Sequence, residues 1–67
     1  MRERINNQIR AKELRVLDNE NKNLGILTFK EALELATQKG LDLIEISPNG
    51  NPPIAKIADF GKYQYEQ

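Results

Sequence analysis

The stretch from Thr28 to Gly40 constrains the fold more than any other part of this 67-residue chain. Thr28 is a suitable N-cap because its hydroxyl can accept a free backbone N–H of the first turn, and Glu31 can complete a capping box. Gly40 can adopt the left-handed conformation that ends many helices. Apolar residues recur at helical spacing along one face: Phe29, Ala32, Leu33, Leu35 and Ala36. The pattern predicts an amphipathic helix, too short to be stable alone, that must pack on a sheet.

Short strands are predicted on both sides of this helix. Before it, residues 14–17 and 24–27 form a hairpin around an asparagine-rich turn, with Gly25 marking a bulge. After it, residues 41–46 carry apolar side chains on both faces, which is typical of an interior strand. A turn over residues 48–53 then leads to a strand over 54–58.

The order of these elements predicts an α+β fold. Four strands in the order β-β-α-β-β form a β-grasp-like mixed sheet with one helix packed across it. Asp59 can cap a second helix that begins at Phe60, and because no C-cap precedes Gln67 we expect a fragment of a longer protein. We divide the chain into a basic, partly mobile arm that docks through Ile9 (1–12), the β-grasp-like domain (13–59) and the start of a further helix (60–67).

Composition excludes several classes of function. The chain has no cysteine and no histidine, so disulfides, thiolate zinc sites and histidine-based acid–base chemistry are excluded. No run of residues has the pattern of a catalytic or phosphate-binding loop, so we predict no enzyme, no cofactor and no small-molecule substrate. The absence of a long apolar run and of a signal-peptide core predicts a cytoplasmic protein that does not enter a membrane.

The charge is zero overall but unevenly distributed. Residues 1–15 carry a net charge of +3, whereas residues 16–54 carry −3. A basic arm on an acidic body favours an anionic partner, although a solvated charged tail explains the same pattern.

Aromatic and cationic residues alternate near the end of the chain. Rings that stack on bases and lysines that neutralise phosphates suit RNA, and this group comprises Lys56, Phe60, Lys62, Tyr63 and Tyr65. Alternatively, Phe60 and Tyr63 pack the second helix onto the sheet.

The run from Lys56 to Gln67 resembles the signature of bacterial translation initiation factor three: a basic residue and aliphatics, then an acidic residue, an aromatic, glycine, a basic residue and further aromatics. The resemblance extends back through Pro52-Pro53, Leu41-Asp42-Leu43, Glu31-Ala32-Leu33 and Leu24-Gly25 to Ile5-Asn6-Asn7-Gln8-Ile9-Arg10, which is similar to the opening I-N-x-x-I-R of the family. Ala58 and Asn21 depart from the family pattern.

This resemblance implies the N-terminal domain of the factor, ending inside the linker helix and lacking the C-terminal domain. The family relationship implies a non-enzymatic, monomeric domain that binds rRNA on the platform side of the small ribosomal subunit, near initiator tRNA, and contributes to start-codon fidelity. A ribosomal protein is a further possible contact, and the alternative function is a β-grasp protein-interaction module that uses a sheet face or edge. The residues predicted to bind RNA or the ribosome are Arg10, Lys12, Arg15, Lys56, Lys62, Tyr63 and Tyr65.

Overall fold

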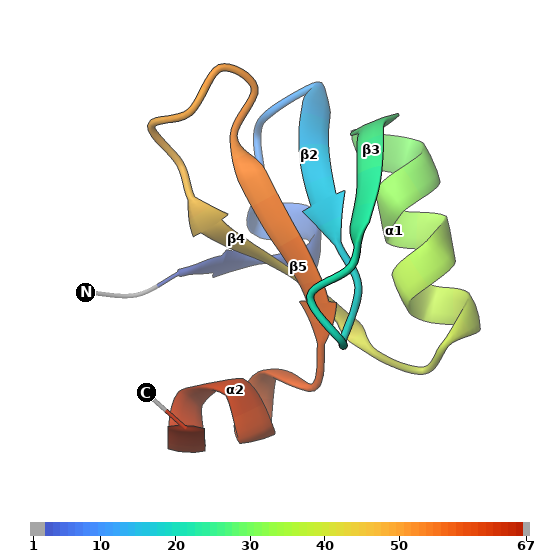
Figure 1. The fold of residues 1–67 in the computed structure, drawn as a ribbon, viewed down its shortest axis with the longest axis vertical. Helices are drawn as coiled ribbons and strands as arrows, with labels where there is room; N and C mark the ends of the chain where they lie inside the picture. Colours follow the sequence, from blue (N-terminus) through green and yellow to red (C-terminus); the bar gives the residue numbers. More distant parts are fainter. Residues whose placement is uncertain (1–2, 67) are drawn as a thin grey trace.

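The computed structural model describes residues 3–66 and consists of one mixed sheet with a helix across one face (Figure 1). The elements, in chain order, are β1 (Arg4–Ile5), the 3-10 turn η1 (Asn6–Gln8), β2 (Glu13–Leu17), β3 (Asn23–Thr28), α1 (Phe29–Gln38), β4 (Asp42–Ser47), β5 (Ile54–Ala58) and α2 (Phe60–Glu66). The strands lie in the order β1-β4-β5-β2-β3. β2 and β5 are parallel, and the other neighbouring strands are antiparallel. The predicted α+β architecture is confirmed.

The helix α1 begins and ends as its sequence predicts. The Thr28 hydroxyl accepts the Glu31 N–H at 3.1 Å, and the Glu31 carboxylate accepts the Thr28 N–H at 3.0 Å. Gly40 has a φ of 69° just beyond the helix. Ala32 and Ala36 are completely buried, and their small side chains allow α1 to lie close to the sheet.

The core lies between α1 and one face of the sheet. It is formed by buried side chains from β2, β4, β5 and α1 together with one from the arm: Ile9, Leu14, Val16, Ala32, Ala36, Leu43, Ala55 and Ile57. Successive strand residues point to opposite faces, so Arg15, Ile44 and Lys56 lie on the face turned away from α1, which we call the open face. Leu43 and Ile44 are both fully buried, which confirms that β4 is an interior strand.

The hairpin between β2 and β3 confirms the predicted turn chemistry. The Asp18 carboxylate accepts the backbone N–H groups of Glu20 and Lys22 at 2.8 and 2.9 Å. Asn21 has a φ of 66°, and Gly25 has a φ of 91° beside a shift in the strand register. Asparagine and glycine are the residues that adopt this backbone conformation at low cost.

The N-terminal arm corrects one detail of the sequence prediction, because the sheet has five strands and not four. Arg4 and Ile5 pair with β4 as a short edge strand. A two-residue strand in a polar segment leaves no alternation that sequence analysis could detect. Ile9 is 5% exposed, which confirms that the arm docks through this residue. The mobility of the arm stays a prediction, and the ends of the two predicted terminal segments (residues 1–2 and 67) lie outside the described residues.

Candidate nucleic-acid interface

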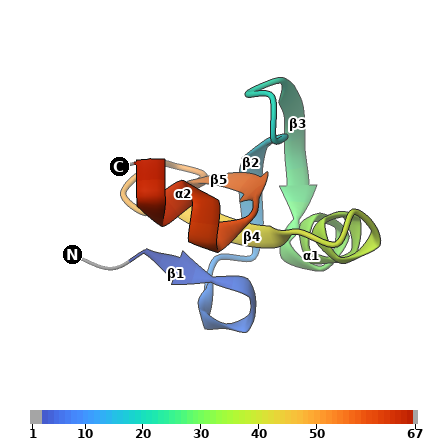
Figure 2. The same cartoon turned by 90° about the horizontal axis from the view of Figure 1, so that it is seen from below.

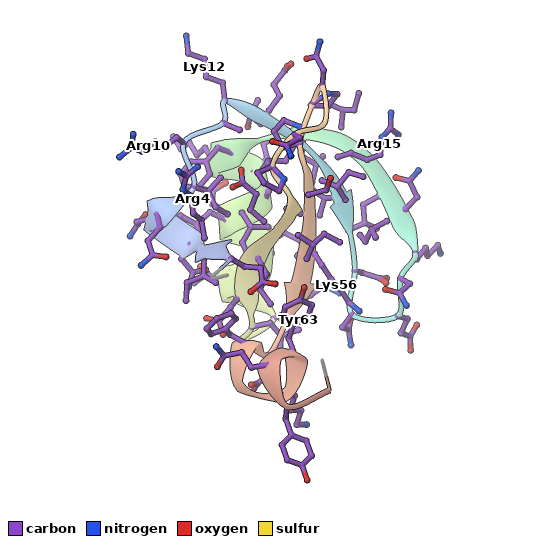
Figure 3. The ribbon with its side chains drawn as sticks, turned by 90° about the vertical axis from the view of Figure 1, so that its left-hand side faces the viewer. Arg4, Arg10, Lys12, Arg15, Lys56 and Tyr63 are labelled. Atoms are coloured by element: carbon purple, nitrogen blue, oxygen red, sulfur yellow. The ribbon has the colours of Figure 1, made fainter. Side chains whose placement is uncertain are left out.

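Arg10 and Lys12 project outward from the extended segment that leads into β2. The buried Ile9 anchors this segment, and Ala11 packs at the edge of the core, so the alternate side chains Arg10 and Lys12 face solvent. The carbonyl of Lys12 also accepts the Phe29 N–H at 2.8 Å, which fixes the backbone of the segment against the start of α1. Figure 3 shows both cations at the end of the molecule where β2 begins.

Arg15 does not join this pair. It lies on the open face in β2, with Ile26 of β3 and Ile54 of β5 as its register neighbours. Its side chain is half-buried, and its position in Figure 3 lies across the sheet from Arg10. The aliphatic stem of Arg15 therefore lies between apolar side chains, and the guanidinium group remains available at the surface.

Lys56, Lys62 and Tyr63 line one open depression of about 220 Å³ beside the start of α2. The remaining lining residues are Asn19, Leu41, Ala58 and Asp59. Lys56 enters this depression from β5, on the open face, while Lys62 and Tyr63 come from α2. The predicted grouping of these three residues in the sequence is therefore also a grouping in space.

Asp59 has a structural role at this depression. Its carboxylate accepts the Lys62 N–H at 3.1 Å, and its carbonyl accepts the Tyr63 N–H at 2.8 Å. The first bond satisfies one of the otherwise free N–H groups in the first turn of α2, and the second is the first bond within the helix; together they confirm the predicted cap. The depression is therefore a mixed-charge surface, with two lysines beside one carboxylate.

The two tyrosines of α2 lie in different environments. The Tyr63 hydroxyl donates a hydrogen bond to the Glu3 carboxylate at 3.3 Å, and its ring stacks on Phe60 with centroids 6.4 Å apart. Burial raises the pKa of Tyr63 above 10.0, and the negative charge and hydrogen bond of Glu3 raise it further. Tyr63 thus connects α2 to the arm through Glu3, a contact that neither sequence interpretation named, whereas Tyr65 is 92% exposed.

The cations predicted to bind RNA form no ion pair with another side chain in residues 3–65. The ion pair in that range joins Arg4 to Glu45 at 3.8 Å. An external anion can therefore bind Arg10, Lys12, Arg15, Lys56 or Lys62 without first breaking an ion pair within residues 3–65. Two clusters result, Arg10 with Lys12 at one end of the sheet and Lys56 with Lys62 near α2.

Sequence analysis missed a polar contact set that joins the arm to β4 and α2. The Asn6 amide donates to the Asp42 carboxylate, which also accepts the Phe60 N–H, each at 3.1 Å. Asn6 lies within the motif that carries the family resemblance, and its φ of 49° shows why asparagine suits the position. Neither its place in the motif nor its preference for a positive φ reveals that Asn6 contacts Asp42 and Leu43.

The described residues contain no cluster of three or more residues that could hold a metal ion. Neither described helix is long and apolar enough to cross a membrane.

Comparison with known proteins identifies the family. A family model described as translation initiation factor IF-3, N-terminal domain, matches residues 5–67. Translation initiation factor IF-3 of Aquifex aeolicus is 52% identical over 63 residues, covering 94% of this chain and 36% of the relative. The protein of the same name from Methylacidiphilum infernorum is 55% identical over 62 residues, covering 92% of this chain and 29% of the relative.

This chain spans about a third of the length of these curated relatives. The relatives bear the name of a translation factor and not of an enzyme, in agreement with the prediction of a non-enzymatic protein. The matched region includes both cation clusters and the Asn6–Asp42 contact. The chain therefore belongs to the translation initiation factor IF-3 family and matches its N-terminal domain.

Proposed function

We propose that this chain binds the platform side of the small ribosomal subunit, contacts rRNA near initiator tRNA, and contributes to start-codon and initiator-tRNA fidelity. Family membership supports the role in translation initiation. The observation that carries the RNA contact is the arrangement of Arg10 and Lys12, which face solvent from a segment fixed by the buried Ile9.

The proposed contact is electrostatic and does not read base sequence. Arg10 and Lys12 form one phosphate contact, and Lys56 with Lys62 forms a second at the other end of the sheet. Such contacts position a domain on RNA without distinguishing bases. Arg15 adds a cation from the open face, and Tyr65 is exposed enough to stack on a base or on a ribosomal protein.

The domain acts in the cytoplasm as a monomer. Its helix α2 is the start of a linker to a second domain of the intact factor. Two tethered domains bind together because the linker raises the effective concentration of the second domain. The isolated chain therefore binds more weakly than the intact protein.

Amide NMR titration of the chain with purified small ribosomal subunits tests this proposal. Large subunits are the control for nonspecific attraction to rRNA. We expect line broadening at Arg10–Arg15 and Lys56–Tyr65 with small subunits only, and a weaker effect at higher salt. Equal broadening with both subunits would contradict the proposed site.

A pair of double variants distinguishes a specific contribution of the arm cations to binding from the effect of losing any two positive charges. Arg10→Gln with Lys12→Gln removes two cations from the proposed contact, and Lys30→Gln with Lys39→Gln removes two exposed cations from α1 and its C-cap. The first variant should weaken binding and reduce the slope of log K against log salt by about 1 per lost contact. The second should leave the slope near that of the unmodified chain.

The alternative function, a protein-interaction module, makes a different prediction. Ile26, in the edge strand β3, is 50% exposed on the open face and gives such a module an apolar contact. Binding that survives nuclease treatment of the partner, with broadening centred on Ile26, would favour this alternative.

A further inference from the structure

The side chain of Asp42 contacts two segments that are far apart in the sequence. One carboxylate oxygen accepts the Asn6 side-chain amide, and the other accepts the backbone N–H of Phe60, each at 3.1 Å. The side-chain oxygen Oδ1 of Asn6 in turn accepts the Leu43 N–H at 2.9 Å. The arm, the start of β4 and the first turn of α2 therefore share one hydrogen-bonded cluster, which we call the Asp42 cluster.

A second contact joins the same two segments directly. The Tyr63 hydroxyl donates to Glu3, 60 positions earlier in the chain. Figure 2 shows β1 and α2 on the same side of the molecule, both next to β4. The arm and α2 are thus connected through Asp42 and through the Tyr63–Glu3 pair.

The helix α2 needs contacts of this kind. It has seven residues, and isolated helices of that length are not stable in water. The Asp59 carboxylate provides a local cap for Lys62, whereas the N–H of Phe60 donates to Asp42 of β4. A hydrogen bond to a charged carboxylate is stronger than one to a neutral acceptor.

We propose that Asp42 couples the docking of residues 3–9 to the formation of the first turn of α2. When the arm is docked, Asn6 holds the carboxylate of Asp42 in the position that receives the Phe60 N–H. When the arm undocks, this orientation and the Glu3 contact are lost, and α2 opens more often. Coupling between two sites is reciprocal, so opening of α2 must also loosen the arm.

The coupling is partial because each segment has an anchor of its own. The arm retains the buried Ile9 and the pairing of β1, and α2 retains the Asp59 cap. Residues 3–9 also lead directly to Arg10 and Lys12 in the same arm. An anion that binds these residues and shifts the arm would therefore change how often α2 is formed.

Amide exchange with water, measured by NMR, tests the forward direction of the coupling. Asn6→Gly removes both amide contacts while tolerating the positive φ, and Asn7→Gly is the matched control at an exposed neighbour. We expect exchange at Phe60 and Tyr63 to rise about three- to tenfold in Asn6→Gly, the range given by one lost hydrogen bond. Faster exchange at Ile5 and Leu43 with unchanged α2 amides would overturn the proposal.

Asp59→Ala tests the reverse direction, in which opening of α2 loosens the arm. It also keeps the proposal testable if Asn6→Gly unfolds the whole domain. This variant removes a cap that does not contact the arm, and Glu20→Ala is a control for loss of an exposed carboxylate. We expect faster exchange at α2 together with a rise of about twofold or more at Leu43, whose N–H reports the docking of Asn6. Faster exchange confined to α2 would show that the two segments open independently.

Discussion

The two helices of this protein are stabilised in different ways. The capping box of α1 joins residues close in sequence, Thr28 and Glu31, and its face is buried through Ala32 and Ala36. Its first N–H, of Phe29, donates to the distant Lys12 carbonyl. The contacts of α2 include residues 18 and 60 positions away, namely Asp42 and Glu3. Both helices thus receive a backbone contact from a distant segment, but only α1 adds a capping box and a buried apolar face of its own, so α2 depends more on the completed fold.

Removing a central core side chain should unfold the domain and with it both α1 and α2. Leu43 is fully buried in β4, so Leu43→Ala should cost about 2–5 kcal/mol of unfolding free energy. A domain of this size has a stability of only about 3–5 kcal/mol, so chemical denaturation should find the variant largely unfolded. Ile26→Ala, at a half-exposed position, is the control and should cost less than about 1 kcal/mol.

Removing the cap of α1 should lower overall stability while leaving α2 and the arm contacts intact. Thr28→Ala deletes the hydroxyl that accepts the Glu31 N–H, and such losses cost about 1 kcal/mol. Thr37→Ala is a suitable control because that hydroxyl donates to Leu33 inside the helix and alanine favours the helical state. The two unfolding free energies, measured in urea, should therefore differ. Equal losses would show that the cap does not determine the stability of α1.

Alkaline pH should weaken the contact between α2 and the arm before it affects α1. The pKa of Tyr63 is raised above 10.0 by burial and by Glu3, so folding stabilises the neutral phenol. That stability is present below pH 10.0 and is lost as pH rises through the folded-state pKa. The difference in tyrosine absorbance between the unmodified chain and Tyr63→Phe should therefore show a midpoint above pH 10.0. Above that midpoint the phenolate can no longer donate to Glu3, so amide exchange at α2 should become faster. A midpoint at or below 10.0 would contradict the Glu3 contact.

Acid pH should produce the smallest effect, confined to the hairpin. Hydrogen bonds from the Lys22 and Glu20 backbone lower the pKa of Asp18 below 3.8. Its contribution is complete above that value and is lost as pH falls through the folded-state pKa. The unmodified chain should therefore lose slightly more stability than Asp18→Asn between pH 5 and about pH 3. Parallel losses in the two proteins would exclude a role for this carboxylate.

Sequence patterns predicted the parts of the fold that depend on near neighbours. The cap at Thr28, the end at Gly40, the turn around Asn21 and the docking of Ile9 all follow from residues within a few positions. The strand β1 could not be predicted, because two residues carry no periodicity and their partner, Glu45 with Ile44, lies about forty positions away.

In the candidate site, as in the fold, the sequence predicted the groupings of near neighbours and not the contacts between distant segments. Alternation in an extended segment places Arg10 and Lys12 together, and proximity in sequence places Lys62 with Tyr63. The separation of Arg15 from Arg10 depends on where β2 begins, which sequence analysis locates only approximately. The contact of Tyr63 with Glu3 depends on the path of the entire chain and has no local signal.

The parallel pairing of β2 with β5 also determines when this domain can fold during its own synthesis. Val16 lies opposite Ala55, so the centre of the sheet joins nearly the first and the last strand of the chain. A hairpin of β2 and β3 can form early, but the parallel pair must wait until residues 54–58 have left the ribosome. Closing so long a loop makes folding slower and more cooperative than in a helical protein of equal size. Until then β2 exposes an unpaired edge and Leu14 and Val16 lack their partners, so the nascent chain is most prone to aggregate in the interval before its final strand emerges.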